Sequence, residues 1–266
     1  MPVDSAHARP TDLEALLGQL ASRPSPAVLW YGSDGGRVEL SGRVGENWIA
    51  KTANLLVDDL GLMPGDRMLL DPTPHWRTLV VAAAAWRLGA TVVLPAADTV
   101  GTPDEEAARL AVVQDRTGAE PAPEDTISPE VTAASKDRLV LAYPGLAMRL
   151  PAGAAQDGDL DYCAEIRAHG DHWSGASRPA AQDPALVGAD AVPVSFERLL
   201  QEARQRAAEL SPGIVVHVGA PRWDAASLTG VLSVWLAQGA VLLSDLAPGP
   251  SLDRALTEER VGLSWS

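Results

Sequence analysis

The side chains best suited to metal or acid–base chemistry lie close together in the middle of the chain. Four carboxylates precede a group of two imidazoles and one further carboxylate: Asp157, Asp159, Asp161, Glu165, His169, Asp171 and His172. A calcium loop beginning at Asp157 would need glycine at position six and glutamate at position twelve, where this chain has Tyr162 and Ala168. A zinc site would need four ligands, and no second cysteine joins Cys163. We therefore interpret the segment as a solvated helix and turn and expect no metal.

Residues that could act as nucleophiles or bases are isolated in the sequence. The serine elbow G-x-S-x-G is absent, because the segment around Ser174 lacks its first glycine. Cys163 has one nearby cation, Arg167, to stabilise a thiolate. His217 lies in the apolar run IVVHV, and we interpret it as a core histidine. His75 follows a predicted strand, where α/β proteins often contact ligands, so it is a candidate for ligand binding. Since no nucleophile and base are paired in the sequence, we do not expect hydrolase chemistry.

Phosphate-binding loops are absent from the sequence. Neither G-x-x-x-x-G-K-[ST] nor G-x-G-x-x-G after a strand occurs, and the two lysines, Lys51 and Lys136, do not follow glycines. A triphosphate would therefore lack both converging backbone N–H groups and a lysine. We expect no cofactor, and in particular neither ATP nor Mg²⁺.

Composition narrows the class of protein further. The 266 residues are 46% hydrophobic, and Lys+Arg 21 against Asp+Glu 35 gives a net charge of −14. Such a chain repels phosphate backbones and anionic lipid surfaces, so we expect neither nucleic acid nor membrane as a partner. One cysteine permits no internal disulfide, and the first ten residues lack an apolar signal core. These features predict a cytoplasmic protein.

The elements needed to position any site follow an α/β pattern. In the first half, hydrophobic periodicity and turn residues predict helices over 11–20, 47–61 and 76–88 and strands over 27–32, 37–40, 67–71 and 91–95. In the second half they predict helices over 195–210 and 227–239 and strands over 214–219 and 240–245, with Ser195 as a helix cap. Between them we predict a helix over 103–116, a loop over 119–130, a strand over 138–144 and a short helix near 160–168.

The two halves resemble each other. A tryptophan in the last helical turn, a Gly-Ala pair and a β-branched strand occur in the same order after Trp86 and after Trp235. We therefore predict an internal duplication that gives two similar lobes with mainly parallel sheets flanked by helices. The predicted division is a first lobe over 1–114, a loop-rich connection with one strand and a short helix over 115–190, and a second lobe over 191–266.

The order of turn motifs resembles the N-terminal domain of the adenylate-forming superfamily, which includes acyl-CoA synthetases. The matching positions are Leu40-Ser41, Gly61, Gly65-Asp66-Arg67, Gly89-Ala90 and Pro95, and the resemblance covers about 40–114 and 183–266. Two positions depart from the family. Where the family has a Lys-containing phosphate loop, this chain has the segment PALVGADAVPVS, with Gly188 and Pro193 as remnants. Where the family has an aromatic–histidine turn, this chain has Ala220-Pro221-Arg222-Trp223-Asp224.

The resemblance implies a truncated, degenerate relative of an uncharacterised actinobacterial type. The sequence ends at Ser266, before the family's adenine-binding segment and its small domain with the catalytic lysine, so no catalytic residue is assigned. We expect a non-catalytic binding or regulatory module. One alternative is a ligase active only as part of a split or complemented enzyme. Another is a binder of an acyl or aromatic ligand in a cleft formed by His75, Trp76, Arg222 and Trp223.

The same resemblance predicts an interaction with protein. A second lobe without the family's remaining strands would leave a sheet edge or an apolar face that needs cover. We therefore expect a protein partner or a homo-oligomer.

Overall fold

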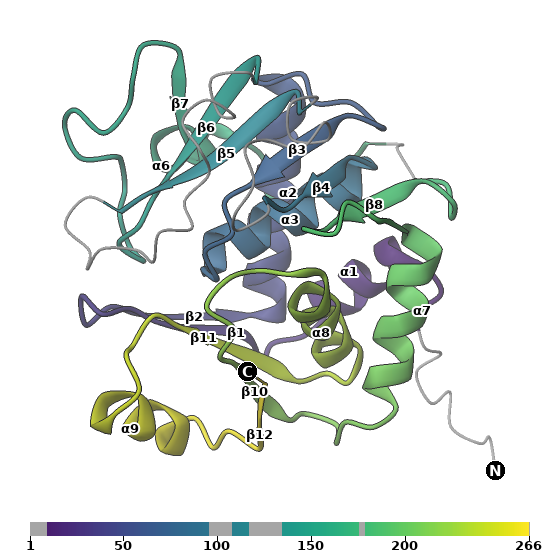
Figure 1. The fold of residues 1–266 in the computed structure, drawn as a ribbon, viewed down its shortest axis with the longest axis vertical. Coiled ribbons are helices and arrows are strands. Elements are labelled where there is room, and N and C mark those ends of the chain that lie inside the picture. The colour runs from purple at the N-terminus through teal and green to yellow at the C-terminus, as the bar shows by residue number, and fades with distance from the viewer. Residues whose placement is uncertain (1–9, 96–107, 117–134, 176–178, 266) are drawn as a thin grey trace.

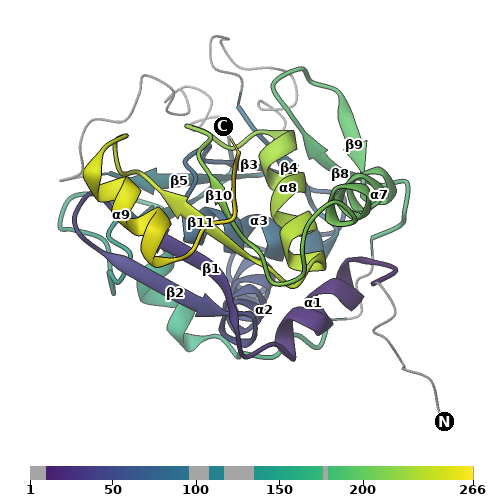
Figure 2. The same ribbon diagram turned by 90° about the horizontal axis from the view of Figure 1, so that it is seen from below.

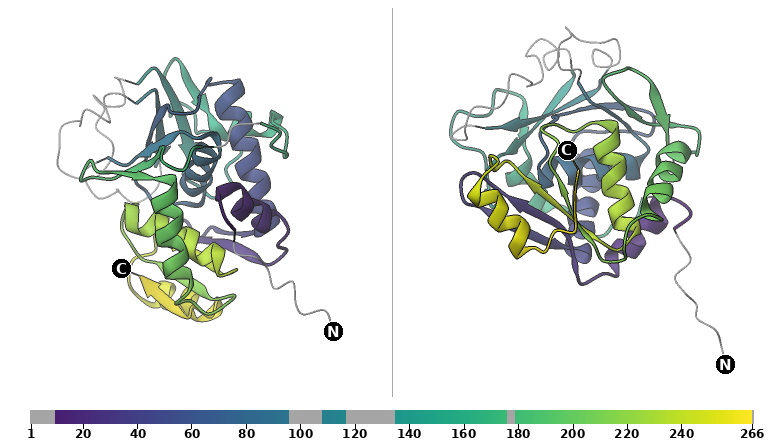
Figure 3. Two further views of the ribbon diagram at one scale, coloured as in Figure 1. Left: turned by 90° about the vertical axis from the view of Figure 1, so that its right-hand side faces the viewer. Right: turned by 60° about the horizontal axis from the view of Figure 1, so that its bottom comes forward.

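The computed structural model describes residues 10–95, 108–116, 135–175 and 179–265, and its main feature is two β-sheets with helices between them (Figure 1; Figure 3). The helices are α1 Leu13–Ala21, α2 Gly42–Asp58, α3 Trp76–Leu88, α6 Tyr162–Glu165, α7 Phe196–Ala207, α8 Ala225–Leu236 and α9 Pro250–Glu258, with a 3₁₀ turn η1 at Ile166–Ala168. The strands are β1 Pro26–Tyr31, β2 Arg37–Ser41, β3 Arg67–Leu70, β4 Thr91–Val93, β5 Leu110–Asp115, β6 Asp137–Ala142, β7 Asp159–Asp161, β8 Pro184–Val187, β9 Pro193–Ser195, β10 Val215–Val218, β11 Ala240–Ser244 and β12 Leu263–Trp265. No helix in the described ranges is long and apolar enough to span a bilayer.

Both sheets are mainly parallel, which confirms the predicted fold class. The seven-stranded sheet has the order β7-β6-β5-β3-β4-β8-β9, and the five-stranded sheet has the order β12-β10-β11-β1-β2. The antiparallel pairs are β8–β9 and β1–β2, each at one side of its sheet. Helices α3 and α8 lie between the sheets, while α9 packs on the outer face of the five-stranded sheet (Figure 2).

The predicted duplication is visible in the order and pairing of the elements. The series β1-β2-α2-β3-α3-β4 recurs as β8-β9-α7-β10-α8-β11. In each series an antiparallel hairpin leads into a helix, and a parallel strand–helix–strand unit follows. The hairpins are exchanged, since β1–β2 pairs with β11 of the second series and β8–β9 pairs with β4 of the first.

The two exchanged hairpins share a proline opposite a serine, and in both the serine caps the next helix. Pro26 lies opposite Ser41 in the first, and Pro184 lies opposite Ser195 in the second. Each serine caps the helix that follows, because its Oγ accepts the backbone N–H three residues on, at 3.2 Å and 3.3 Å respectively. The same local sequence signals thus start α2 and α7.

The two repeated tryptophans also have equivalent partners. The indole N–H of Trp86 donates to the carbonyl of Ala185 at 2.8 Å, and that of Trp235 donates to the carbonyl of Ala27 at 3.2 Å. Each acceptor lies on the exchanged hairpin beside the strand that follows the tryptophan. These hydrogen bonds satisfy buried indoles and fix each hairpin to the other series.

Sheet membership crosses the predicted boundaries 1–114, 115–190 and 191–266. β1 and β2 lie with β10, β11 and β12, although they belong to the first range. The division into lobes stays a prediction, because membership of a sheet does not define a unit that folds by itself.

The helix predicted over 103–116 is wrong in its described part. Leu110–Asp115 forms strand β5, which lies between β3 and β6 in the seven-stranded sheet. The Ala- and Glu-rich composition before it favours a helix, but Leu110, Ala111 and Val112 are buried and pair with strands on both sides, and tertiary pairing overrides such propensity. Residues 103–107 and the loop predicted over 119–130 lie outside the described residues.

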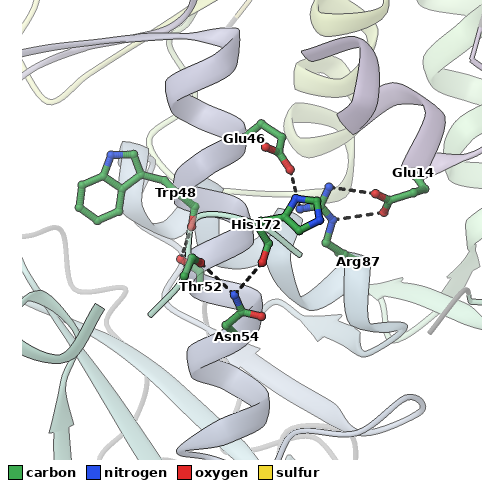
Figure 4. Close-up of polar contacts among 8 residues, drawn as sticks. Glu14, Glu46, Trp48, Thr52, Asn54, Arg87 and His172 are labelled. Atoms are coloured by element: carbon green, nitrogen blue, oxygen red, sulfur yellow. Dashed lines mark hydrogen bonds and ion pairs between the residues drawn. The ribbon is translucent and has the colours of Figure 1, made fainter. Parts of the chain in front are cut away.

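Helix α3 is buried along its whole length, and this includes its polar side chains. All thirteen residues from Trp76 to Leu88 are buried. Arg87, with a side chain only 2% exposed, donates to Glu14 at 3.1 Å and to Glu46 at 2.8 Å (Figure 4). The two carboxylates come from α1 and α2, so one buried cation joins three helices.

Replacing Arg87 by methionine should therefore strongly destabilise the fold. Methionine keeps the apolar stem but leaves Glu46 half-buried without its cation, so we expect the unfolding free energy to fall by about 3 kcal/mol. The control is Arg198→Met, which removes an exposed pair with Glu202 and should cost about 0.5 kcal/mol or less. Urea unfolding of both variants measures the difference, and equal losses would contradict the role given to Arg87.

Candidate functional site

The turn between β8 and β9 lies at the position where the adenylate-forming superfamily has its phosphate loop. Two hydrogen bonds close this turn. The N–H of Ala191 donates to the carbonyl of Gly188 at 2.9 Å, and the N–H of Val192 donates to Oδ1 of Asp190 at 3.2 Å. The turn is exposed and carries one carboxylate. The N–H of Val192, which could otherwise bind a phosphate, is thus bonded to the carboxylate of Asp190.

The N-terminus of α8 lies beside this turn and is also occupied by a carboxylate. A Cβ added at Gly188 would lie 3.8 Å from Cβ of Ala225, the first residue of α8. Asp224 caps this helix, with Oδ1 accepting the N–H of Ser227 at 2.6 Å. A helix N-terminus attracts anions through its free N–H groups and its dipole, and here an aspartate already fills that place.

The loop between β10 and α8 binds the carboxyl end of the other sheet. The backbone N–H of Trp223 donates to the carbonyl of Pro72 at 2.6 Å, and its indole N–H donates to Oγ1 of Thr78 at 2.9 Å. The Arg222 guanidinium donates to the carbonyl of Pro95. Three hydrogen bonds therefore join the loop after β10 to the segments after β3 and β4.

His75 is a buried helix cap. It is 0% exposed, and its Nδ1 accepts the backbone N–H of Arg77 at 3.1 Å at the start of α3. The ring lies 4.6 Å from the Trp30 ring, centroid to centroid. Burial holds the pKa of His75 well below its ordinary value, and the nearby Arg77 and Arg116 lower it further. The ring is therefore neutral, with its proton on Nε2.

The four residues of the predicted ligand cleft take two different positions. His75, Trp76 and Trp223 are 0%, 2% and 1% exposed and belong to the interface between the sheets. Trp76 packs its ring edge against Trp48, with ring centroids 5.2 Å apart. Arg222 instead lines an open cavity.

This cavity has a volume of about 610 Å³ and lies at the carboxyl end of β10, within the size range of small-ligand sites. It is lined by Arg206, Glu209, Leu210, Val218, Ala220, Pro221, Arg222, Asp224, Ala226, Ser227, Leu263 and Trp265. Two of its polar side chains bond to the chain itself, since Arg206 donates to the carbonyl of Ala226 at 2.7 Å and Asp224 caps α8. The remaining lining is largely apolar.

Three members of the acidic cluster of residues 157–172 have structural contacts. Asp161 caps α6 and accepts the N–H of Leu150, while Asp159 pairs with Arg138. His169 bonds Asp59 at 2.9 Å. Within the described ranges, no group of three or more His, Cys, Asp or Glu side chains is placed to hold a metal ion.

Other residues that shape the site lie outside the predicted cleft, and the sequence contains signals for them. Thr78 stands three residues after His75 and Ser227 three residues after Asp224, and both pairs form capping boxes in the structure. Asp190 lies in the turn that replaces the phosphate loop. Glycines and cations are the usual sequence signals of a phosphate site, whereas the side chains that define these two places are the anions Asp190 and Asp224.

A curated relative from Mycobacterium tuberculosis (strain ATCC 25618 / H37Rv) is similar along most of the chain. It is described as a TIGR03089 family protein and is 30% identical over 244 residues, 89% of each chain. No family model matches this sequence.

Three solved structures share the fold at low sequence identity. They are an acyl-CoA synthetase of Brucella canis (TM-score 0.66, 18% identity), the N-terminal domain of FACL13 from Mycobacterium tuberculosis (0.69, 15%) and a Mycobacterium tuberculosis fatty acyl CoA synthetase (0.66, 17%). Each match covers 95% of this chain, but 50%, 62% and 48% of those chains. The present chain thus spans about half the length of the two synthetases. These matches confirm the predicted resemblance to the N-terminal domain of the adenylate-forming superfamily at the level of the fold.

The buried neutral His75 should make stability depend on pH. Its folded-state pKa lies well below the unfolded value of about 6.5, so the unfolded chain takes up a proton first as the pH falls. The contribution is therefore complete above the unfolded pKa and is lost progressively below it. His75→Asn keeps a capping side chain that does not titrate, and should reduce the stability lost between about pH 7.5 and pH 5.5 by about 1.4 kcal/mol.

Urea unfolding at both pH values measures this difference. The exposed His172→Asn serves as the control and should leave the pH dependence unchanged. Comparing the two pH values within each variant removes the packing loss at residue 75. An unaltered pH dependence in His75→Asn would contradict the assignment.

Proposed function

The chain belongs to the TIGR03089 family, and from this premise we propose that it is a non-catalytic protein with an adenylate-forming fold, acting as a binding or regulatory module. The observation that carries the proposal is the pair of carboxylates at the two places suited to a phosphate. Asp190 holds the N–H of the β8–β9 turn, and Asp224 holds the first turn of α8.

Electrostatics make these two aspartates unfavourable for nucleotide binding. A phosphate charge about 4 Å from a carboxylate is repelled by about 1 to 4 kcal/mol, depending on how much water surrounds the pair. Adenylate formation also needs preorganised positive charge around the reacting phosphate, and the turn supplies a negative one. The net charge of −14 adds repulsion at longer range.

The fold itself supports binding. The loop after β10 is fixed to the other sheet by Trp223 and Arg222, so the open cavity beside it has rigid walls. A preformed apolar surface binds without an ordering cost. The fold would then serve recognition in the absence of acyl activation.

ATP–pyrophosphate exchange with a panel of carboxylic acids tests the proposal. We expect no exchange by the purified protein and no heat of ATP·Mg²⁺ binding in calorimetry. A complete acyl-CoA synthetase assayed in parallel shows that the conditions support exchange. Reproducible exchange by this chain would overturn the proposal.

Matched variants test the electrostatic reason. Asp190→Asn/Asp224→Asn keeps both hydrogen-bond acceptors but removes two charges, and should raise affinity for ATP about tenfold. Asp157→Asn/Asp171→Asn changes the net charge equally at exposed sites elsewhere and should have a much smaller effect. Equal effects of the two pairs would show that overall charge, and not these two positions, disfavours ATP.

A further inference from the structure

A second pocket, with a volume of about 290 Å³, lies on the surface of α2. It is formed by the first half of this helix together with η1, which packs against it. The described residues that line it are Val44, Asn47, Trp48, Lys51, Ile166 and Arg167. None of these six lines the cavity beside β10, so the two hollows are separate.

The charge of this pocket is opposite to that of the chain. Among the described residues that line it, Lys51 and Arg167 are cations and none is a carboxylate. The chain as a whole has 35 Asp+Glu against 21 Lys+Arg. Arg43, four residues before Asn47 on the same helix, is exposed as well. This face of α2 is thus a basic patch on an acidic protein, and it attracts anionic partners.

The two acids nearest to the pocket in the sequence do not line it. Glu46 lies on the other side of α2 from Trp48, where it accepts a hydrogen bond from Arg87 at 2.8 Å (Figure 4). Side chains two residues apart on a helix point in different directions, which separates Glu46 from the pocket. Glu165 precedes Ile166 and is exposed. The two cations are therefore not neutralised by a carboxylate inside the pocket.

The interior of the pocket is apolar and is held in place by the core. The Trp48 ring packs against Trp76, with ring centroids 5.2 Å apart, and lies 6.4 Å from the Tyr162 ring. Ile166 is 1% exposed, whereas Val44 is 39% exposed and open to a partner. A surface that is already ordered binds without the cost of ordering it.

The ammonium group of Lys51 is positioned as well. Its Nζ donates to the carbonyl of His169 at 2.5 Å, which leaves two further N–H groups for a ligand. Arg167 is exposed two residues before that carbonyl. Apolar groups flanked by cations form a surface of the kind found in protein interfaces, where an apolar centre has a polar rim.

We propose that this pocket binds an acidic segment of a protein partner. An apolar side chain of the segment packs against Trp48, and its carboxylates bind Lys51 and Arg167. Charge selects the partner, because basic segments are repelled here and attracted elsewhere on the acidic surface. In the described part of the chain two segments wall the pocket, which suits one anchoring side chain. Sites for small ligands bury most of the ligand's surface.

This inference rests on the proposed role as a binding module and names the partner of that module by its chemistry. The two are tested separately. ATP–pyrophosphate exchange does not involve the pocket on α2, so a failure of peptide binding would leave the absence of catalysis standing, and the reverse also holds.

Selection from a random peptide library displayed on phage tests the chemistry of the partner. We expect the enriched peptides to share an apolar residue flanked by Asp or Glu. Fluorescence anisotropy of the labelled consensus peptide then gives its affinity, which should fall as salt is added, because salt screens exposed charges. Enriched peptides without acidic residues, or no enrichment, would overturn the proposal.

Matched variants test the place of binding. Lys51→Gln/Arg167→Gln removes two cations and should weaken peptide binding about tenfold. Val44→Glu puts a carboxylate into the pocket at an exposed position and should weaken binding at least as much. Arg198→Gln/Arg254→Gln removes two exposed cations from α7 and α9 and should change the affinity about twofold or less. Circular dichroism confirms that the variants are folded.

Two other occupants are distinguished by the same variants. Calorimetric binding of phenylacetate that Val44→Glu abolishes, without peptide enrichment, would assign the pocket to a small organic acid. A dimer in light scattering that Val44→Glu converts to a monomer would assign it to a second copy of the chain. Either result would overturn the proposal, as would equal effects of the two double variants or unchanged peptide binding in Val44→Glu.

Discussion

The complete burial of α3 is the constraint on which the rest of the structure depends. A helix between two sheets has no solvent-facing side, so its polar side chains depend on partners inside the protein, and Arg77, Thr78, Trp86 and Arg87 have them. Arg77 donates to four backbone carbonyls, one at the end of β6 and three in the segment after it. Thr78 accepts the Trp223 indole N–H, Trp86 donates to β8, and Arg87 joins two carboxylates. The helix thereby fixes the positions of α1, α2, both sheets and the loop after β10.

Exchange of the hairpins makes the two halves of the chain depend on each other. Because β1–β2 completes the sheet of the second series and β8–β9 completes that of the first, neither sheet forms from one half alone. The indoles of Trp86 and Trp235 make the equivalent hydrogen bond in each half. Formation of the two sheets is therefore coupled through contacts between residues far apart in sequence, which predicts slow, cooperative folding.

The same framework separates fold from chemistry. The three solved structures share this fold at 15–18% identity, which establishes a fold and leaves function to the site. At the site, Asp190 and Asp224 occupy the backbone groups that would otherwise attract a phosphate. The same scaffold also holds the loop after β10 against the other sheet and leaves an open cavity beside it.

The features that could be predicted correctly are those that depend on residues close together in the sequence. Ser195 as a cap, Gly89 as the end of α3 with φ 81°, and the two strand–helix–strand units all follow from interactions within a few positions. Much of the fold and the phosphate-loop departure could be predicted in this way. Three further features became visible in the folded chain alone: residues 110–115 form a strand, the hairpins are exchanged, and His75 is a buried cap. Those outcomes depend on pairing and burial between distant segments, to which local patterns are insensitive.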